Sequence, residues 1–235
     1  MGTSREERAL ENERRRRRYA ADAARYDASA DRTERWLFGT EHRGWVCDRA
    51  RGLTLEVAIG TGLNISLYPV DVRLIAVDLT PEMMRFSVDR ASDLGCTVSF
   101  CEADAQSLPF GDATFDTVVA TYAMCAVPDL PLTIREMRRV LAPGGRLLLL
   151  DHVRSTVAPF RWLQKLLELA PSRDRDELTR RPRDDVEAAG FTIEESGRFR
   201  SGIVERVAAV KADRGHDPAR PRPGDAVRPP VQPSQ

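Results

Sequence analysis

The stretch LTLEVAIGTGLN, residues 53–64, decides the fold of this chain. Its first half is an apolar, β-rich run, and small residues follow at once in Ile59-Gly60-Thr61-Gly62. Such a loop is typical of the turn between a strand and the next helix, where glycine lets a ligand approach the main chain and the helix N-terminus. Two glycines also occur in ordinary tight turns, so the meaning of this loop depends on the segments that follow.

Short β-rich runs alternate with helical stretches along the rest of the chain. A helix is predicted over 81–94, with Thr80 as its N-cap and Gly95 as its stop, and another over 130–141, ended by Pro143. This alternation predicts βαβ units and a parallel sheet. The predicted strands are Leu53–Ala58, Arg73–Asp78, Val98–Cys101, Phe115–Thr121 and Arg146–Leu150.

Two more strands are predicted near the end, over 191–199 and 203–210, separated by Ser201 and Gly202 in a hairpin. Helices are predicted before them, over 160–169 and 184–189. We therefore predict an α/β fold: a Rossmann-like, doubly wound, mostly parallel sheet of seven strands, with a C-terminal antiparallel hairpin and an N-terminal helical cap.

Composition divides the 235 residues into one domain with two flanking segments. Residues 1–18 form a polar N-terminal extension, whose run Arg14–Arg18 is interpreted as a solvated helix face rather than an RNA- or lipid-binding arm. The domain covers 19–212, with a helical cap over 19–50 and a core over 51–212. The tail over 213–235 is rich in Pro and Arg and is expected to be disordered.

Charge and cysteine usage exclude several classes of protein. Basic and acidic residues both number 36, so no net field favours nucleic acid, and no nucleic-acid partner is expected. The four cysteines show no metal-ligand spacing, which predicts free buried thiols and no metal. Without a membrane-spanning or signal segment we expect a cytoplasmic protein. Contact at the periphery of a membrane and the oligomeric state are left open.

Asp78 indicates what the glycine loop binds. It ends the second apolar run, where a doubly wound fold places a carboxylate that binds ribose hydroxyls. The same arrangement binds nicotinamide cofactors, so this pair of features predicts nucleoside binding without naming the cofactor.

Five segments, in order, resemble the class I S-adenosylmethionine-dependent methyltransferases, especially the type 11 group with the ubiquinone and menaquinone C-methyltransferases. The resemblance covers roughly residues 19–210, and Ala58 stands where that family usually has its first glycine. The segments are EVAIGTG at 56–62, VDLTPEM at 77–83, EADAQSLPF at 102–110, FDTVV at 115–119 and RVLAPGGR at 139–146.

The resemblance implies S-adenosylmethionine as cofactor and roles for particular residues. Asp78 would bind the ribose, Asp104 the adenine amine with Ala105 against the ring, and Glu56 would organise the loop. For Asp104, a solvated turn acid is the alternative, and for Tyr26 an ordinary packed tyrosine. The implied cofactor-binding residues are Tyr26, Glu56, Ala58, Gly60, Gly62, Asp78, Leu79, Asp104, Ala105 and Thr121.

The acceptor side is less specific. Phe160, Trp162, Leu163, Leu166 and Leu167 are interpreted either as an apolar lid or as a helix stripe buried on the core. Together with the resemblance, they favour methyl transfer by direct displacement to a small, partly apolar acceptor.

Asp151 and His152 directly follow the fifth predicted strand, so both are candidate catalytic residues at the ligand crevice. His152 would act as a base, or would instead only shape the pocket. The competing function classes are a catalytically silent cofactor-binding or interaction protein and a nicotinamide-dependent oxidoreductase.

Overall fold

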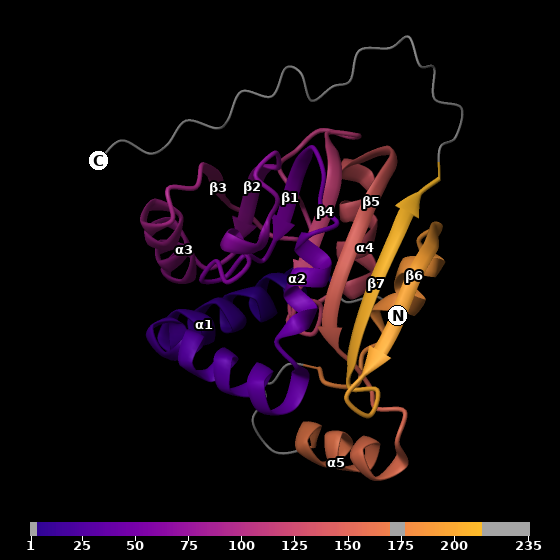
Figure 1. The fold of residues 1–235 in the computed structure, drawn as a ribbon. Coiled ribbons are helices and arrows are strands. Elements are labelled where there is room, and N and C mark those ends of the chain that lie inside the picture. Colours follow the sequence, from indigo (N-terminus) through magenta and orange to yellow (C-terminus); the bar gives the residue numbers. More distant parts are fainter. Residues whose placement is uncertain (1–3, 170–176, 213–235) are drawn as a thin grey trace.

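The structure is a computed structural model that describes residues 4–169 and 177–212. One sheet of seven strands, ordered β3-β2-β1-β4-β5-β7-β6, forms its centre (Figure 1). The strands are β1 (Leu53–Val57), β2 (Arg73–Asp78), β3 (Val98–Glu102), β4 (Phe115–Thr121), β5 (Leu141–His152), β6 (Phe191–Phe199) and β7 (Val204–Lys211).

The first five strands pair in parallel, and β7 pairs antiparallel with both β5 and β6. Because β1 lies between β2 and β4, the chain order reverses at β1, and a crevice forms at the carboxyl ends of these strands. The predicted fold class, with its parallel sheet and antiparallel hairpin, is confirmed.

The predicted strand bounds differ from the structure where the backbone changes character. β1 ends one residue early because Ala58 takes a left-handed φ of 57°. β5 begins at Leu141 rather than Arg146, since Leu141 pairs with Phe115 across a bulge. The Pro-Gly-Gly run after Leu141 signalled the end of a helix and concealed the beginning of this strand.

Helices cover both faces of the sheet. Along β5, Leu147 and Leu149 pack into a core beneath α4, while Leu148 and Leu150 pack into a second core beneath α2. This alternation follows the period of two in a strand, and it explains why the four residues 147–150 of β5 are all apolar. The helices are α1 (Arg5–Thr33), α2 (Glu41–Cys47), α3 (Pro81–Asp93), α4 (Leu130–Val140), α5 (Ala158–Glu168) and α6 (Pro182–Ala188), with a π-helical turn η1 (Glu34–Phe38) and a 3-10 turn η2 (Ile65–Leu67).

The N-terminal helix α1 is longer than the sequence indicates. It runs without a break through residue 18, where the predicted extension would end, and it lies along one end of the sheet against α3 (Figure 1). A capping box between Ser4 and Glu7 starts it. The expectation that residues before 19 bury no face is wrong at Arg15, which is buried. The basic run is therefore only partly a solvated face.

Two further expectations need correction. Cys47 and Cys125 are buried, but Cys101 is half-buried and Cys96 is exposed, because Cys96 follows the turn at Gly95. The apolar stripe of α5 is not buried on the core, since no residue of that helix is buried.

Among the described residues, no helix combines the length and the apolar character needed to cross a bilayer. The predicted disordered tail over 213–235 lies outside the described residues.

Gly62 is required for packing. Its φ is +80°, and a Cβ at this position would stand 2.8 Å from Ser87 Cβ and 3.1 Å from Ser87 Cα on α3. The helix thus packs directly on the loop after β1.

We expect Gly62→Ala to lower the free energy of unfolding by roughly 2 kcal/mol or more, because backbone strain adds to a clash with the backbone of α3. The matched control is Gly95→Ala, where φ is +64° but nothing lies within 4 Å of the added Cβ. That variant should lose only about 1 kcal/mol. Urea denaturation measures both, and equal losses would show that packing at Gly62 is not tight.

Candidate functional site

A cavity lies at the carboxyl ends of β1, β2 and β4, closed on one side by α1. It brings together residues from seven segments: α1, α2, the loop after β1, the end of β2, the start of α3, the loop after β3 and the end of β4 with its following loop. The cavity lining includes eight of the sequence-predicted site residues, namely Tyr26, Ala58, Gly60, Asp78, Leu79, Asp104, Ala105 and Thr121.

Four other predicted residues are not part of this lining: Glu56, Gly62, Asp151 and His152. Glu56 and Asp151 are buried, with exposed fractions of 2% each. Gly62 turns toward Ser87 rather than toward the cavity.

The carboxylate of Asp78 ties together the two loops that border the cavity. Its Oδ2 accepts from Gly60 N at 2.8 Å, and its Oδ1 accepts from Thr80 N at 2.8 Å, at the start of α3. Burial raises the pKa of Asp78, although these backbone donors oppose the shift. Each carboxylate oxygen has a second lone pair, so Asp78 retains the capacity to accept from a ligand.

Asp104 is held from two directions. Gln106 N donates to its Oδ1 at 2.8 Å, and Asn12 Nδ2 of α1 donates to its Oδ2 at 2.6 Å. A primary amide thus occupies the acceptor that the resemblance assigns to an exocyclic amine. Asp104 is half-buried and lines the cavity beneath α1.

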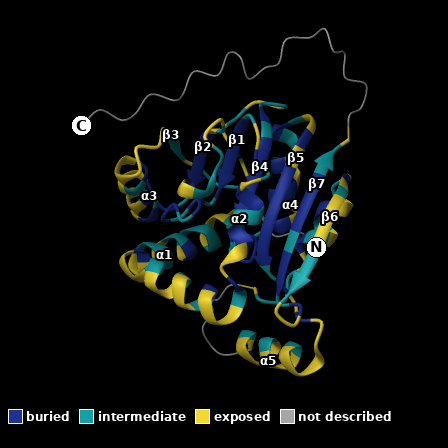
Figure 2. Ribbon diagram, viewed as in Figure 1, coloured by how far each residue is buried: buried dark blue, intermediate teal, exposed yellow. Residues whose placement is uncertain are grey.

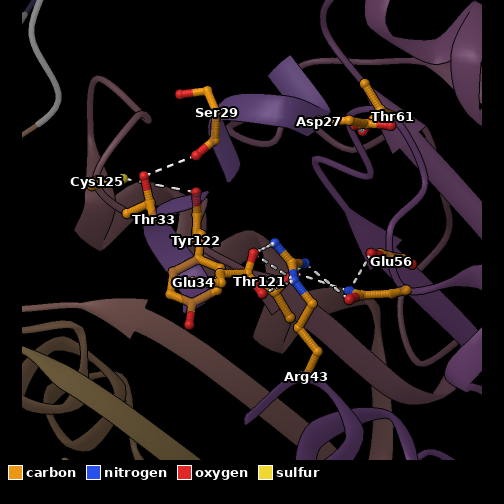
Figure 3. Close-up of polar contacts among 11 residues, drawn as sticks. Asp27, Ser29, Thr33, Glu34, Arg43, Glu56, Thr61, Thr121, Tyr122 and Cys125 are labelled. Atoms are coloured by element: carbon orange, nitrogen blue, oxygen red, sulfur yellow. Dashed lines mark hydrogen bonds and ion pairs between the residues drawn. The ribbon is translucent and has the colours of Figure 1, made fainter. Parts of the chain in front are cut away.

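A buried polar network supports the loop after β1 from behind the cavity (Figure 3). Asn64 Nδ2 donates to Glu56 Oε1 at 2.7 Å and to Thr121 Oγ1 at 2.9 Å. Arg43 Nη1 donates to Asn64 Oδ1 and to Thr121 Oγ1, both at 2.9 Å, and its guanidinium pairs with Glu34 at 2.6 Å. The network joins the cap to β1 and β4.

Glu56 sits at the far end of this network and has a perturbed pKa. Desolvation by burial raises the pKa of Glu56 to about 7, although hydrogen bonds from Tyr68 and Asn64 lower it. Tyr68 Oη donates to Glu56 Oε2 at 2.9 Å. Glu56 therefore organises the loop, as the resemblance implies, through Asn64 rather than from the cavity wall.

Helix α1 is attached to the loop after β1 by Asp27, which bonds the Thr61 hydroxyl and pairs with Arg90 of α3. Tyr26, its neighbour, lines the cavity. Tyr26 thus lines the cavity, and Asp27 attaches α1 to the loop after β1.

Asp151 and His152 lie beside the cavity. Asp151 accepts from Met124 N at 2.6 Å and so holds the loop after β4, which lines the cavity through Tyr122 and Ala123. Phe38 stacks on both His152 and Tyr122, with ring centroids 5.8 and 5.3 Å apart. Phe38 thus covers one face of the His152 ring.

One group of the described residues has donor atoms close enough to hold a metal ion: Cys125, Asp151 and His152, within 4.8 Å of one another. Asp151 already uses one oxygen for Met124 N and the other for His152 N. Both oxygens of Asp151 therefore bind backbone amides, and these bonds account for the place of Asp151 beside Cys125 and His152.

Sequence reasoning missed the contribution of α1 and α2 to the site. Asn12, Arg15, Arg16, Tyr19 and Arg43 all line the cavity. Arg15 and Arg16 are part of a basic run that also fits a solvated face, and Arg43 is more than 60 residues from its partner Thr121. No local pattern indicates these contacts.

Glu56 makes stability depend on pH. Its pKa is about 7 in the folded protein and near its ordinary value of 4.5 when unfolded, so the folded state binds more protons between these values. The free energy of unfolding should therefore fall as pH rises from about 5 to about 8, by roughly 2 to 3 kcal/mol from this group. Asp78, whose pKa is also raised, adds in the same direction.

We expect Glu56→Gln to flatten this fall, since an amide of the same shape does not titrate. Thermal melting across this pH range, with Glu82→Gln on the exposed start of α3 as control, measures the difference. A profile for Glu56→Gln that matches the wild type would show that Glu56 is already ionised at pH 5.

Residues 55–149 match the family model described as a methyltransferase domain. A phosphatidylethanolamine N-methyltransferase from Cereibacter sphaeroides is 33% identical over 118 residues, which cover 49% of this chain and 58% of the relative. A ubiquinone/menaquinone biosynthesis C-methyltransferase UbiE from Cellvibrio japonicus is 36% identical over 143 residues, covering 55% of each chain. This chain thus spans little more than half the length of these curated relatives.

Solved structures share the fold. A putative methyltransferase from Bacillus halodurans superposes with a TM-score of 0.63 at 19% identity, covering 72% of this chain and 96% of the other. A putative methyltransferase in complex with the Trm112 activator from Haloferax volcanii has a TM-score of 0.68 at 18% identity, covering 86% and 99%. Residues 55–149 thus form a methyltransferase domain, and the solved structures share the fold around it.

Proposed function

We propose that this protein binds S-adenosylmethionine in the cavity beneath α1 and transfers its methyl group to a small, partly apolar acceptor. The observation that carries the proposal is that Asp78 and Asp104, from the ends of different strands, line one cavity with the loop after β1. A nucleoside offers hydroxyls and an exocyclic amine, which are the donors that two carboxylates at such positions accept.

The residues present fit this cofactor. Asp78 would accept from the ribose hydroxyls, while Asp104 and the Ala105 amide would meet the adenine, with Leu79 beside the ring. Ala58, Gly60 and Thr121 would border the methionine portion, and Tyr26 would close the cavity from α1. When bound, the sulfonium supplies an electrophilic methyl group that leaves to yield a neutral thioether.

The chain itself contributes positioning and exclusion of water. Asn12 Nδ2 donates to Asp104 Oδ2. When the cofactor binds, the exocyclic amine of its adenine would take the place of the Asn12 amide at this oxygen. Because the same helix carries Tyr19 and Tyr26, α1 would then cover the bound nucleoside. Holding donor and acceptor in line supplies much of the rate in a direct displacement.

The acceptor side of the cavity is apolar near Ala126, Val127 and Pro128. This lining supports a partly apolar acceptor and leaves the acceptor atom open. Asp151 would act as a positioning residue through Met124 N, and His152 would either accept a proton from the acceptor or shape the pocket through its stacking on Phe38.

A catalytically silent binding protein would keep the cofactor cavity without turnover, and a nicotinamide-dependent oxidoreductase would use Asp78 in the same way. Two features favour methyl transfer over the oxidoreductase. Asp104 lines the same cavity, and residues 55–149 match a methyltransferase domain.

We expect Asp78→Ala to weaken S-adenosylmethionine binding by at least about 100-fold, because two charge-assisted hydrogen bonds of about 1.5 to 3 kcal/mol each are lost. Calorimetry measures the affinity, and Asp71→Ala, an exposed acid in the loop before β2, is the control. Wild-type affinity in Asp78→Ala, or binding of reduced nicotinamide nucleotides in place of S-adenosylmethionine, would refute the proposal.

We expect His152→Ala to keep cofactor affinity within a few-fold but to lower turnover once an acceptor is known, either by loss of a base or by loosening of Phe38. Single-turnover rates between about pH 6 and pH 9 separate the two, because loss of a base changes the pH profile. Unchanged turnover across this range would exclude both roles.

A further inference from the structure

Helix α5 turns its polar side toward the protein. Gln164 Nε2 donates to Val153 O at 2.9 Å and to Leu178 O at 3.2 Å, and its Oε1 accepts from Ser155 N at 2.7 Å. One turn later, Glu168 accepts from the backbone and hydroxyl of Thr179 at 2.8 and 3.0 Å. Residues four apart share one face of a helix, so these bonds fix the orientation of α5.

The opposite face of α5 is apolar and faces outward. Trp162, Leu166 and Leu169, spaced four and three residues apart, expose 71%, 65% and 81% of their surface. Leu163 flanks them and is also exposed, and Figure 2 shows most of this helix in the colour of exposed residues. A contiguous apolar surface of this kind marks a site of interaction rather than a core element.

Three exposed cations lie near this face among the described residues, and the exposed Glu41 lies near one of them, Arg200. Lys165 lies on α5, and Arg154 precedes the helix; both are exposed. The turn that carries the exposed Arg200 is held beside the start of α5, because Ser155 Oγ donates to Ser201 O at 2.7 Å. The acid of the helix, Glu168, is turned inward.

We propose that the outward face of α5 docks this protein on the surface of a membrane with anionic headgroups. A helix with Trp and Leu on one face and cations at its margin lies in the bilayer interface, with its apolar side about 5 to 10 Å deep and its cations at the headgroups. A second copy of the chain fits this surface less well, since a symmetric contact would bring Lys165, Arg154 and Arg200 against like charges.

The position of α5 connects this contact to the site. The helix follows the carboxyl end of β5, at the same end of the sheet as the cavity. Docking therefore turns that end of the molecule toward the bilayer, where apolar molecules are held. The membrane contact itself does not depend on the proposed methyl transfer.

Flotation with lipid vesicles tests the docking surface. The full chain is incubated with vesicles of phosphatidylcholine alone and of phosphatidylcholine with about 30 mol% phosphatidylglycerol, at low and high salt. The test variant is Trp162→Ser/Leu166→Ser. The control is Val70→Ser/Leu94→Ser, which removes exposed apolar side chains in the loop before β2 and at the end of α3. Circular dichroism and gel filtration verify the fold and the oligomeric state of each.

We expect the wild type and the control to bind the anionic vesicles, and the α5 variant to lose at least about tenfold in binding. Lys165→Glu should weaken binding to the anionic vesicles. It should leave the weaker binding to vesicles of phosphatidylcholine alone unchanged. The proposal is overturned if the wild type does not float with either vesicle, if both double variants bind equally, or if the α5 face instead mediates a dimer or a protein contact without vesicle binding.

Discussion

The buried carboxylate of Asp78 is the constraint on which the site depends. It accepts from Gly60 N in the loop after β1 and from Thr80 N at the start of α3, so one side chain joins the two segments that border the cavity. Burial raises the pKa of Asp78, and the two backbone donors offset part of this energetic cost. Asp78 lines the cavity, and each of its oxygens keeps a second lone pair.

The two sides of the cavity around this carboxylate are held by different interactions. On one side lies the sheet with its two apolar cores, and close packing at Gly62 allows α3 to approach the loop. On the other side lies α1, a polar helix held by hydrogen bonds and ion pairs rather than by apolar burial. Asn12 and Asp27 attach it at its two ends, to Asp104 and to the loop after β1. Such hydrogen bonds and ion pairs can be replaced by contacts with a ligand, which suits a helix that covers the cavity.

Local patterns were enough to predict the sheet, because β2 and β4 are apolar runs bounded by turn residues and their limits match the structure. The cavity-lining positions of Asp78 and Asp104 follow from the same logic, since strand ends in a doubly wound fold meet at one crevice. Three features have no local signal. Arg43 reaches Thr121 only through the fold, Arg15 is buried although its run is basic, and α5 presents the face that amphipathic patterning assigns to the core. Ala58 adopts a left-handed φ that its side chain disfavours, so the predicted strand extended one residue too far, although the glycines that follow indicated the turn.

Hydrogen–deuterium exchange of the wild-type protein, with and without S-adenosylmethionine, tests most directly that the cavity beneath α1 is the cofactor site. We expect the cofactor to slow exchange at Gly60, Thr80 and Ala105, and in the first half of α1 around Asn12, because bound ligand holds both the strand ends and the covering helix closed. Protection confined to other parts of the molecule, or exchange at these four positions that the cofactor leaves unchanged, would contradict this site.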